Sequence, residues 1–276
     1  MKKYSRIIIG SIILAAMLGS GFRRAVASAT DELLANDGND ATNPINRFDA
    51  RTQITWLPDI NTPSQVFDGR TYESETLRND TVFFSKPDQL QLRIDVPLAW
   101  ANIPTAQNPN GLTRFGLGDV LMQGLYSHLF NPRWATAVGV RAFLPTATDQ
   151  ALGAGKLQIG PTVDVRASLP EVSVGSYASL TVRQFFSAGG DPSRRDIKYT
   201  SIQPQINIAL PNQWYLNTAP NIQYNLHSRK WFVPIDGTIG KKFGEPWTVS
   251  FEYIYGLVQD NPRYSQFIDF QIGYFY

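Results

Sequence analysis

Apolar and polar side chains alternate with a period of two along much of the chain. Residues 157–169 read LQIGPTVDVRASL, in which every odd position is apolar and every even position is small or polar. Successive side chains of a β-strand point to opposite faces, so this pattern predicts a strand with one apolar and one polar face. The alternation recurs in 90–100, 202–210, 214–226, 247–257 and 267–276, less cleanly in 134–144, 174–186 and 231–243, and weakly near 53–57 and 77–85. Residues 117–130 are also strand-like, but the pattern there does not assign the faces.

Short and long connections alternate between these segments. Short turns are expected at 86–88, 131–133, 170–171, 211–213 and 244–246. The other links are mostly longer, at 101–116, 145–156, 187–198 and 258–263, with a shorter one at 226–230. Consecutive antiparallel strands therefore place the short turns at one end and the long loops at the other, which is typical of outer-membrane barrels. The last strand then runs towards the short-turn end, where we expect Tyr276.

Tryptophan positions indicate two aromatic levels. Trp134, Trp214 and Trp247 each begin a strand just after a short turn, whereas Trp100 and Trp231 lie towards the opposite strand ends. Aromatic girdles at both membrane surfaces are a feature of transmembrane barrels. The sequence therefore predicts a girdle made of Trp100, Trp134, Trp214, Trp231, Trp247 and Tyr276.

Alternation alone does not say which face points inward, but barrel size does. Eight strands already nearly fill a barrel, and this chain offers about a dozen. Side chains could not fill so wide an interior with apolar packing, and segments of 11 to 13 residues match the roughly 9–11 that cross a bilayer. We predict an all-β fold, a transmembrane antiparallel up-and-down β-barrel of 12 strands, with 10 as the alternative. A soluble two-sheet sandwich stays open as a rival fold.

The first residues have the features of an export signal. Lys2, Lys3 and Arg6 precede an apolar stretch at 7–22, and Ala27-Ser28-Ala29 suits cleavage, so residues 1–29 are predicted to be a signal peptide. Residues 30–50 are predicted to be a mobile polar segment, and residues 51–276 an outer-membrane β-barrel. These assignments imply export through the Sec pathway to the outer membrane of a Gram-negative cell.

Composition excludes several classes of protein. Beyond the signal, no apolar run approaches the roughly 20 residues that a membrane helix needs. The chain has no cysteine, so it has no disulfide and no thiolate metal site. Cleavage after Ala29 removes five basic residues and no acidic one, which changes the balance from 25 basic and 23 acidic residues to 20 and 23. The basic charge therefore belongs to the signal, and we expect no nucleic-acid partner.

Charged residues on the polar faces are candidates for lining a pore. They carry both signs, which suits either a charge-selective lining or ion pairs that brace the interior. The predicted pore-lining set is Arg93, Asp95, Arg141, Asp164, Arg166, Arg183, Asp236, Lys242, Glu252 and Asp269. Four aromatic residues are also expected to face inward: Phe143, Tyr177, Phe185 and Phe267.

The chain offers little material for catalysis. It has two histidines, His128 and His227, and neighbours on a strand such as His227 and Ser228 point to opposite faces. Two histidines without a carboxylate cluster argue against a metal site. Gly153-Ala154-Gly155-Lys156 lacks the spacing of a phosphate loop. We therefore expect no enzymatic activity, no metal and no cofactor.

Four stretches resemble a known family of exported barrels. They are GLGDVLMQGLYS at 116–127, LPTATDQALGAGKLQIGP at 144–161, QPQINIALPNQWYLNTAPNIQYN at 203–225 and KWFVPIDGTIGKKFG at 230–244. The family is described as outer-membrane transporters linked to the meta-cleavage pathway of phenol degradation. The resemblance covers roughly residues 110–245, implies a barrel and a transport role, and assigns no functional residue.

The sequence therefore predicts an outer-membrane channel for passive movement of small solutes, with aromatic or hydrophobic solutes as an expected class. An outer-membrane lipid-modifying enzyme and a structural or adhesive barrel are the alternatives. The expected partners are outer-membrane lipid, a small-molecule solute, and the barrel-assembly machinery acting through the C-terminal strand.

Overall fold

The computed structural model describes residues 38–57, 60–62, 65–67, 70–105, 108–244, 246–261 and 263–276. The expected signal peptide and the first part of the expected mobile segment lie outside these residues. The strands are β1 (Arg47–Trp56), β2 (Ile60–Thr62), β3 (Gln65–Phe67), β4 (Thr71–Phe83), β5 (Asp88–Thr105), β6 (Asn108–Leu117), β7 (Val120–Leu129), β8 (Trp134–Leu144), β9 (Lys156–Ser168), β10 (Tyr177–Gly190), β11 (Lys198–Ala209), β12 (Trp214–Thr218), β13 (Ile222–Asn225), β14 (Lys230–Phe243), β15 (Trp247–Gln259) and β16 (Gln266–Phe275).

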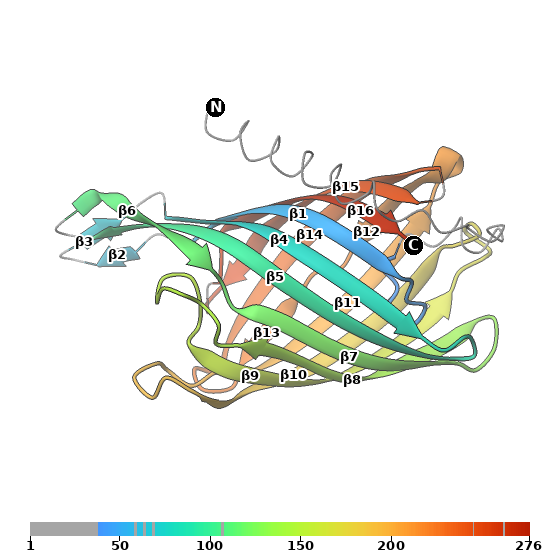
Figure 1. The fold of residues 1–276 in the computed structure, drawn as a ribbon, viewed down its shortest axis with the longest axis horizontal. Coiled ribbons are helices and arrows are strands. Elements are labelled where there is room, and N and C mark those ends of the chain that lie inside the picture. Colours follow the sequence, from blue (N-terminus) through green and yellow to red (C-terminus); the bar gives the residue numbers. More distant parts are fainter. Residues whose placement is uncertain are drawn as a thin grey trace.

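All of these strands except β2 and β3 belong to one antiparallel sheet, which closes into a barrel (Figure 1). The first and last strands, β1 and β16, pair over ten residues, from Arg47 opposite Phe275 to Trp56 opposite Gln266. Fourteen strands belong to the sheet, but β6 pairs only with β5, and β12 and β13 are two parts of one wall strand. The wall therefore has twelve strands, which confirms the predicted number.

The two ends of the barrel differ as expected. Short turns join β4 to β5, β7 to β8, β11 to β12 and β14 to β15, where β11–β12 uses the 3-10 turn η1 (Pro211–Gln213). The fifth connection at this end, expected as a short turn at 170–171, is longer and spans residues 169–176 between β9 and β10. The C-terminus lies at this short-turn end, because the Phe275 N–H donates to the Pro246 carbonyl at 2.7 Å. The predicted position of Tyr276 at the short-turn end is therefore confirmed.

The long-loop end departs from one expectation. Residues 101–116, expected to be a loop, are mostly strand: β5 continues to Thr105 and turns back as β6, with Leu98 opposite Leu117. This hairpin and the small β2–β3 hairpin project beyond the barrel at the end away from the C-terminus (Figure 1). A β-hairpin can satisfy its own backbone groups, so the strand need not stop where the wall does.

The wall turns its apolar residues outward. On β9, Val163 and Val165 are 49% and 46% exposed, whereas Thr162 and Asp164, which alternate with them, are buried. The other strands show the same alternation, and the exposed outer residues include Leu92, Ile94, Met122, Val138, Val140, Leu180, Val182, Ile206, Leu216, Ile235, Ile239, Phe251 and Leu257. Here "outer face" means this side of the wall, and "inner face" means the side towards the barrel axis.

Not all of the outer face is apolar. Glu73 and Glu75 lie on the outer face of β4 near the loop end, opposite Trp100 and Leu98 of β5. The Thr52 hydroxyl of β1 donates to the Glu75 carboxylate at 2.9 Å.

Among the described residues, no helix is long and apolar enough to cross a membrane.

One wall strand is interrupted. The sequence predicts a continuous strand over 214–226, but β12 ends at Thr218 and β13 begins at Ile222. Pro220, which has no N–H to donate, lies in the gap. Inner-face side chains satisfy the freed backbone groups: Asp236 accepts from the Ala219 N–H at 2.8 Å, and Gln203 donates to the Ala219 carbonyl at 3.0 Å.

The expectation that Val163 faces lipid gives a direct test. We predict that Val163→Arg lowers the free energy of unfolding from lipid vesicles by about 2–4 kcal/mol, because it places a charge near the middle of the apolar band. Urea titration followed by tryptophan fluorescence measures this change. Val163→Leu is the control and should leave stability nearly unchanged; equal stability of both variants would contradict the outward assignment.

Candidate functional site in the barrel interior

The predicted pore-lining residues all lie on the inner face. Strand register places each of the ten in line with buried polar residues, and five of them have less than a tenth of their surface exposed: Asp95, Asp164, Arg183, Lys242 and Asp269. The interior of the barrel is therefore polar and charged along its length. That these residues line a conducting pore stays a prediction.

Cross-strand ion pairs line one side of the interior. Arg78 of β4 donates two hydrogen bonds to Asp95 of β5, at 2.8 and 2.7 Å, and Arg93 of β5 donates two to Asp80 of β4, at 2.6 and 2.7 Å. The two pairs are nearest same-face neighbours, because Arg78 lies opposite Asp95 and Asp80 opposite Arg93. Two parallel N–H···O bonds fix the geometry of a guanidinium on a carboxylate. This geometry therefore fits the interpretation that Arg93 and Asp95 form ion pairs that brace the interior.

The ion-paired region continues through the seam of the barrel. Arg51 of β1 pairs with Asp269 of β16, and Arg47 pairs with Asp49 on the same strand at 2.7 Å. Glu252 of β15 lies directly opposite Asp269, so two carboxylates and one guanidinium meet at this level. The interior near β1, β15 and β16 therefore carries acidic charge that arginines partly balance.

The remaining predicted residues have other kinds of neighbour. Asp164 accepts from the Thr181 hydroxyl, and Lys242 lies with its ammonium 5.2 Å from the ring centre of Phe275. Arg141 donates a hydrogen bond to the side-chain oxygen of Gln123, and Arg183 donates one to that of Gln203, each at 2.8 Å. Their acceptors are therefore neutral amides rather than carboxylates. Arg166 pairs with Asp40 at 2.9 Å, and Asp236 accepts from Thr218 and Ala219 as part of the strand interruption.

The expected inner aromatic residues form contacts across neighbouring strands. The rings of Phe143 and Phe185 are 5.8 Å apart, and the ring of Phe185 stacks on that of Tyr199 at 4.9 Å. The guanidinium of Arg263 lies 4.7 Å from the centre of the Tyr199 ring. Tyr177 is buried, and its hydroxyl accepts a hydrogen bond from Gln205 at 2.9 Å. The ring centres of Phe267 and Tyr264 are 6.0 Å apart.

The segment before β1 lies across the short-turn end of the interior. Its residues Asp40 and Thr42 are buried, and Asp40 pairs with Arg166 on β9. The Gly38 carbonyl accepts from Arg47 of β1 at 2.6 Å. Because β1 and β9 stand on well-separated parts of the wall, these contacts carry the segment across the opening. Residues 38–46 of the expected mobile segment are thus packed, and Arg47–Ala50 already belong to β1.

Two connections fold inward at the long-loop end. In the connection 145–155, Leu152 is 1% exposed and packs with Ala99 and Ala101 of β5. In the connection 260–265, Arg263 and Tyr264 contact rings of the inner face, Tyr264 being 4.8 Å from Phe232. Both ends of the interior are therefore narrowed by chain segments.

A loop-end ion pair fixes the start of β9. Lys156, which is buried, lies with its ammonium 2.9 Å from the Asp196 carboxylate of the next connection. The hydrogen bond from Lys156 lowers the pKa of Asp196, and the positive charge acts in the same direction.

The predicted girdle residues lie at the two ends of the outer face. Trp134, Trp214 and Tyr276 are exposed at the short-turn end, where Trp247 contacts Tyr274 at 4.9 Å. At the loop end, Trp100 contacts Phe115 at 4.9 Å and Trp231, which is exposed, contacts Tyr224 at 4.7 Å. A role at the lipid headgroups stays a prediction for these residues.

The histidines do not assemble a hydrolytic site in the described part of the chain. The His128 ring lies 2.7 Å from Asp88, on the outer face near the turns, and no serine or threonine hydroxyl bonds to it there. His227 and Ser228 follow β13 in a short turn, where their N–H groups both donate to the Asn225 side chain at 2.9 Å. No cluster of three or more histidine, aspartate or glutamate residues that could hold a metal occurs within the described ranges.

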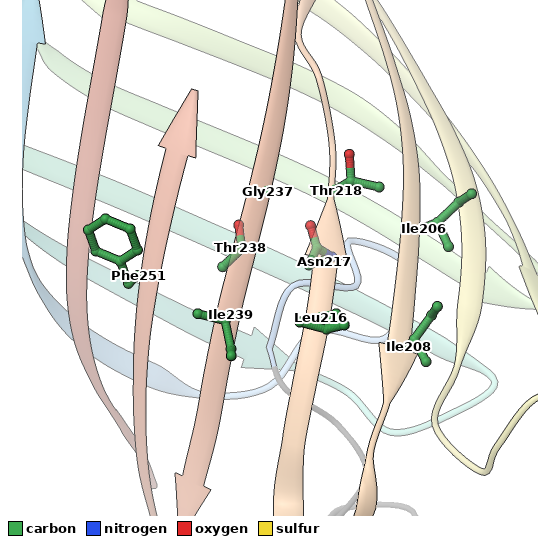
Figure 2. Close-up of a pocket in the computed structure, with 9 residues that line it drawn as sticks. All are labelled: Ile206, Ile208, Leu216, Asn217, Thr218, Gly237, Thr238, Ile239 and Phe251. Carbon is green, nitrogen blue, oxygen red and sulfur yellow. The ribbon is translucent and has the colours of Figure 1, made fainter. Parts of the chain in front are cut away.

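A hollow of about 450 Å³ lies in the wall beside the strand interruption (Figure 2). Outer-face side chains of four strands line it, including Ile206, Leu216, Ile239 and Phe251. Gly237 leaves it open, because a Cβ there would meet nothing within 4 Å. The hollow belongs to the outer apolar band, so it is not part of the charged interior.

Comparison with known proteins supports the fold. No protein-family model matches the chain, and no curated protein matches it. Among solved structures, an outer membrane channel from Pseudomonas putida F1 is similar, with a TM-score of 0.65 and 12% identity over 87% of this chain and 98% of that one. The NanC porin has a TM-score of 0.54 at 11% identity, over 83% of this chain and 98% of the porin chain. The KdgM porin has a TM-score of 0.53 at 10% identity, over 83% of this chain and 99% of the porin chain.

Sequence reasoning missed several interior residues. Arg78 and Asp80 lie on β4, whose outer face has too few apolar residues for the alternation to stand out. Arg47, Asp49 and Arg51 lie on β1, where they alternate with Phe48, Ala50 and Thr52 in RFDARTQITW. That signal was present in the sequence, but the expectation of a mobile segment at 30–50 overlooked it. Asp40 and Arg263 lie outside strands, where alternation predicts nothing. For Arg78 and Asp80 a signal existed, since the alternating charges RND on one segment and RID on the other suit two adjacent antiparallel strands.

The buried pair of Asp80 with Arg93 should matter more than an exposed pair. We predict that Asp80→Asn lowers the free energy of unfolding by about 3 kcal/mol or more, because Arg93 loses its carboxylate in a buried setting. Glu171→Gln is the control: Glu171 pairs with Arg133 at 2.9 Å, but both side chains are more than half exposed. Urea unfolding should show no measurable change for that variant. Equal effects of the two substitutions would show that the interior pair is not stabilising.

Proposed function

We propose that this chain forms a channel in the outer membrane of a Gram-negative cell, through which small solutes move passively. The observation that carries the proposal is a closed ring of twelve strands with an apolar outer face and a charged inner face. An open edge would leave backbone groups unpaired in hydrocarbon at several kcal/mol each, and closure removes that edge. Charged side chains inside such a ring favour water over lipid.

The outer face supports the membrane location. Its exposed residues include valine, leucine, isoleucine and phenylalanine on most strands of the wall, with aromatic residues towards both ends. A contiguous apolar surface of this kind is rare on soluble monomers and marks contact with lipid or protein. The predicted signal at residues 1–29 supplies the export route through the Sec pathway, and insertion by the barrel-assembly machinery through β16 is part of the proposal.

The inner face supports transport rather than chemistry. Its charges are held in place by hydrogen bonds, and a fixed pattern of charge can select solutes without breaking a bond. The similar solved structures are an outer membrane channel and two porins, which supports the same role. Inner rings such as Phe143 and Phe185 favour aromatic solutes, as does the resemblance to transporters linked to phenol degradation.

Planar-bilayer recording tests the proposal. Purified protein should insert in discrete steps and conduct potassium chloride, and liposomes that contain it should swell in solutions of small permeant solutes. Protein that inserts fully into vesicles, shown by heat-modifiable migration on a gel, but never conducts or admits a solute would contradict a channel.

The segment across the short-turn end gives a more specific prediction. Asp40→Ala removes the pairing with Arg166 and the hydrogen bonds from Thr42, so the segment is held less firmly across the opening. We expect a larger mean single-channel conductance in the Asp40→Ala protein. Glu171→Gln, a change on the outside of the same barrel end, should leave conductance unchanged. Equal conductance in the unmodified protein, the Asp40→Ala variant and the Glu171→Gln variant would show that the segment does not limit ion flow.

A further inference from the structure

Three arginines of the interior lack the acidic partner that the others have. Arg51, Arg78, Arg93 and Arg166 each pair with an aspartate. Within the described residues, Arg141, Arg183 and Arg263 form no ion pair: the first two donate to glutamine side chains and the third lies over the ring of Tyr199. The interior therefore carries a local excess of positive charge.

Burial makes this excess costly. Arg183 is only 6% exposed, and its Nε has no hydrogen-bond partner; the buried Nε of Arg263 also has none. A buried charge without a counter-charge, and a buried donor without an acceptor, each destabilise the folded protein. A neutral glutamine oxygen accepts a hydrogen bond but does not balance the charge. An anion would do both.

The strand order brings the three arginines to one place. Arg141 on β8 lies opposite Gly160 on β9, and Arg183 on β10 lies opposite Thr162 on β9. Gly160 and Thr162 are consecutive inner-face positions of β9, so the two arginines flank the same part of that strand. Tyr199 on β11 lies within electrostatic reach of Arg141, Arg183 and Arg263. Asp164 is the acidic residue nearest in register to Arg183, and it is within electrostatic reach without forming an ion pair.

Aromatic rings stand beside these guanidinium groups. Phe143, Phe185 and Tyr199 form a row across β8, β10 and β11, with ring centres 5.8 and 4.9 Å apart. Gly160 of the intervening strand makes room for the row, since a Cβ there would lie 2.5 Å from the Phe185 ring. A flat ring of a solute can pack against such a row by offset or edge-to-face contact.

We propose that these residues form a binding site for a small aromatic carboxylate, an inference that rests on the proposed channel function and names its solute class. The carboxylate accepts hydrogen bonds from Arg141 and Arg183, whose planar donor groups match its two oxygens. The ring packs against the half-buried Phe143 at the edge of the row, because Phe185 and Tyr199 are only 3% and 8% exposed and support Phe143 from behind. Arg263, on the inward-folded connection 260–265, closes the site on the loop side.

Titration calorimetry on detergent-solubilised full-length protein tests the site without requiring conduction. Benzoate is the probe, benzyl alcohol lacks the charge, cyclohexanecarboxylate lacks the aromatic ring, and sulfate is an anion without a ring. We expect benzoate to bind most tightly, and Arg183→Gln and Arg141→Gln each to weaken it about tenfold or more. Phe143→Leu should weaken benzoate binding but leave sulfate binding unchanged.

The controls separate this site from general charge and from the channel itself. Arg133→Gln removes an exposed arginine that lies outside the interior and pairs with Glu171, and it should leave benzoate affinity unchanged. Heat-modifiable gel migration shows that each variant is folded. Two results would overturn the site. One is equal affinity for benzoate and benzyl alcohol. The other is normal folding of Arg183→Gln and Arg141→Gln with no loss of benzoate affinity. Conductance in potassium chloride, recorded in parallel, reports on the channel function independently.

Discussion

Pairing of every backbone N–H and C=O group along the wall is the constraint on which this structure depends. Strands that face hydrocarbon have no water to bond with, so the sheet must close on itself. The ten-residue seam between β1 and β16 achieves this closure. Where the wall is interrupted between β12 and β13, inner-face side chains replace the missing strand contacts: Asp236 and Gln203 bond to Ala219. A charged residue that resembles a pore determinant in the sequence thus holds the wall together.

Closure with twelve strands leaves an interior too wide for a packed apolar core, and its charges fall into two groups. Around β1, β4 and β5, arginines and aspartates pair in fixed cross-strand geometry, as Arg78 does with Asp95. Along β8 to β11, Arg141 and Arg183 meet only neutral acceptors and stand beside aromatic rings. The first group is explained by stability alone. The second is not, because unbalanced buried charge opposes folding, and it is the part of the interior most suited to bind a solute.

Alternation predicted the strands, the outward face and the strand number because each wall strand has two contrasting environments. It gave only a weak signal for β4, where polar residues such as Glu75 occupy the outer face, whereas the clearer alternation of β1 overlaps the segment 30–50 that was expected to be mobile. It could not show that 101–116 forms a hairpin beyond the wall, since a self-paired hairpin needs no lipid-facing side. It placed Arg183 and Arg141 on the inner face, but which charges meet depends on register and on connections such as 260–265, and neither follows from a period of two.

Residue-by-residue exposure along β9 tests the central claim, that the apolar face of the wall meets lipid while the polar face encloses the interior. The chain has no cysteine, so single cysteines at each position from 157 to 168 can carry a spin label without background. In lipid vesicles, collisions with dissolved oxygen should rise at the odd positions, Leu157, Ile159, Pro161, Val163 and Val165, and fall at the even positions between them. A flat profile, or maxima at the even positions, would contradict the account.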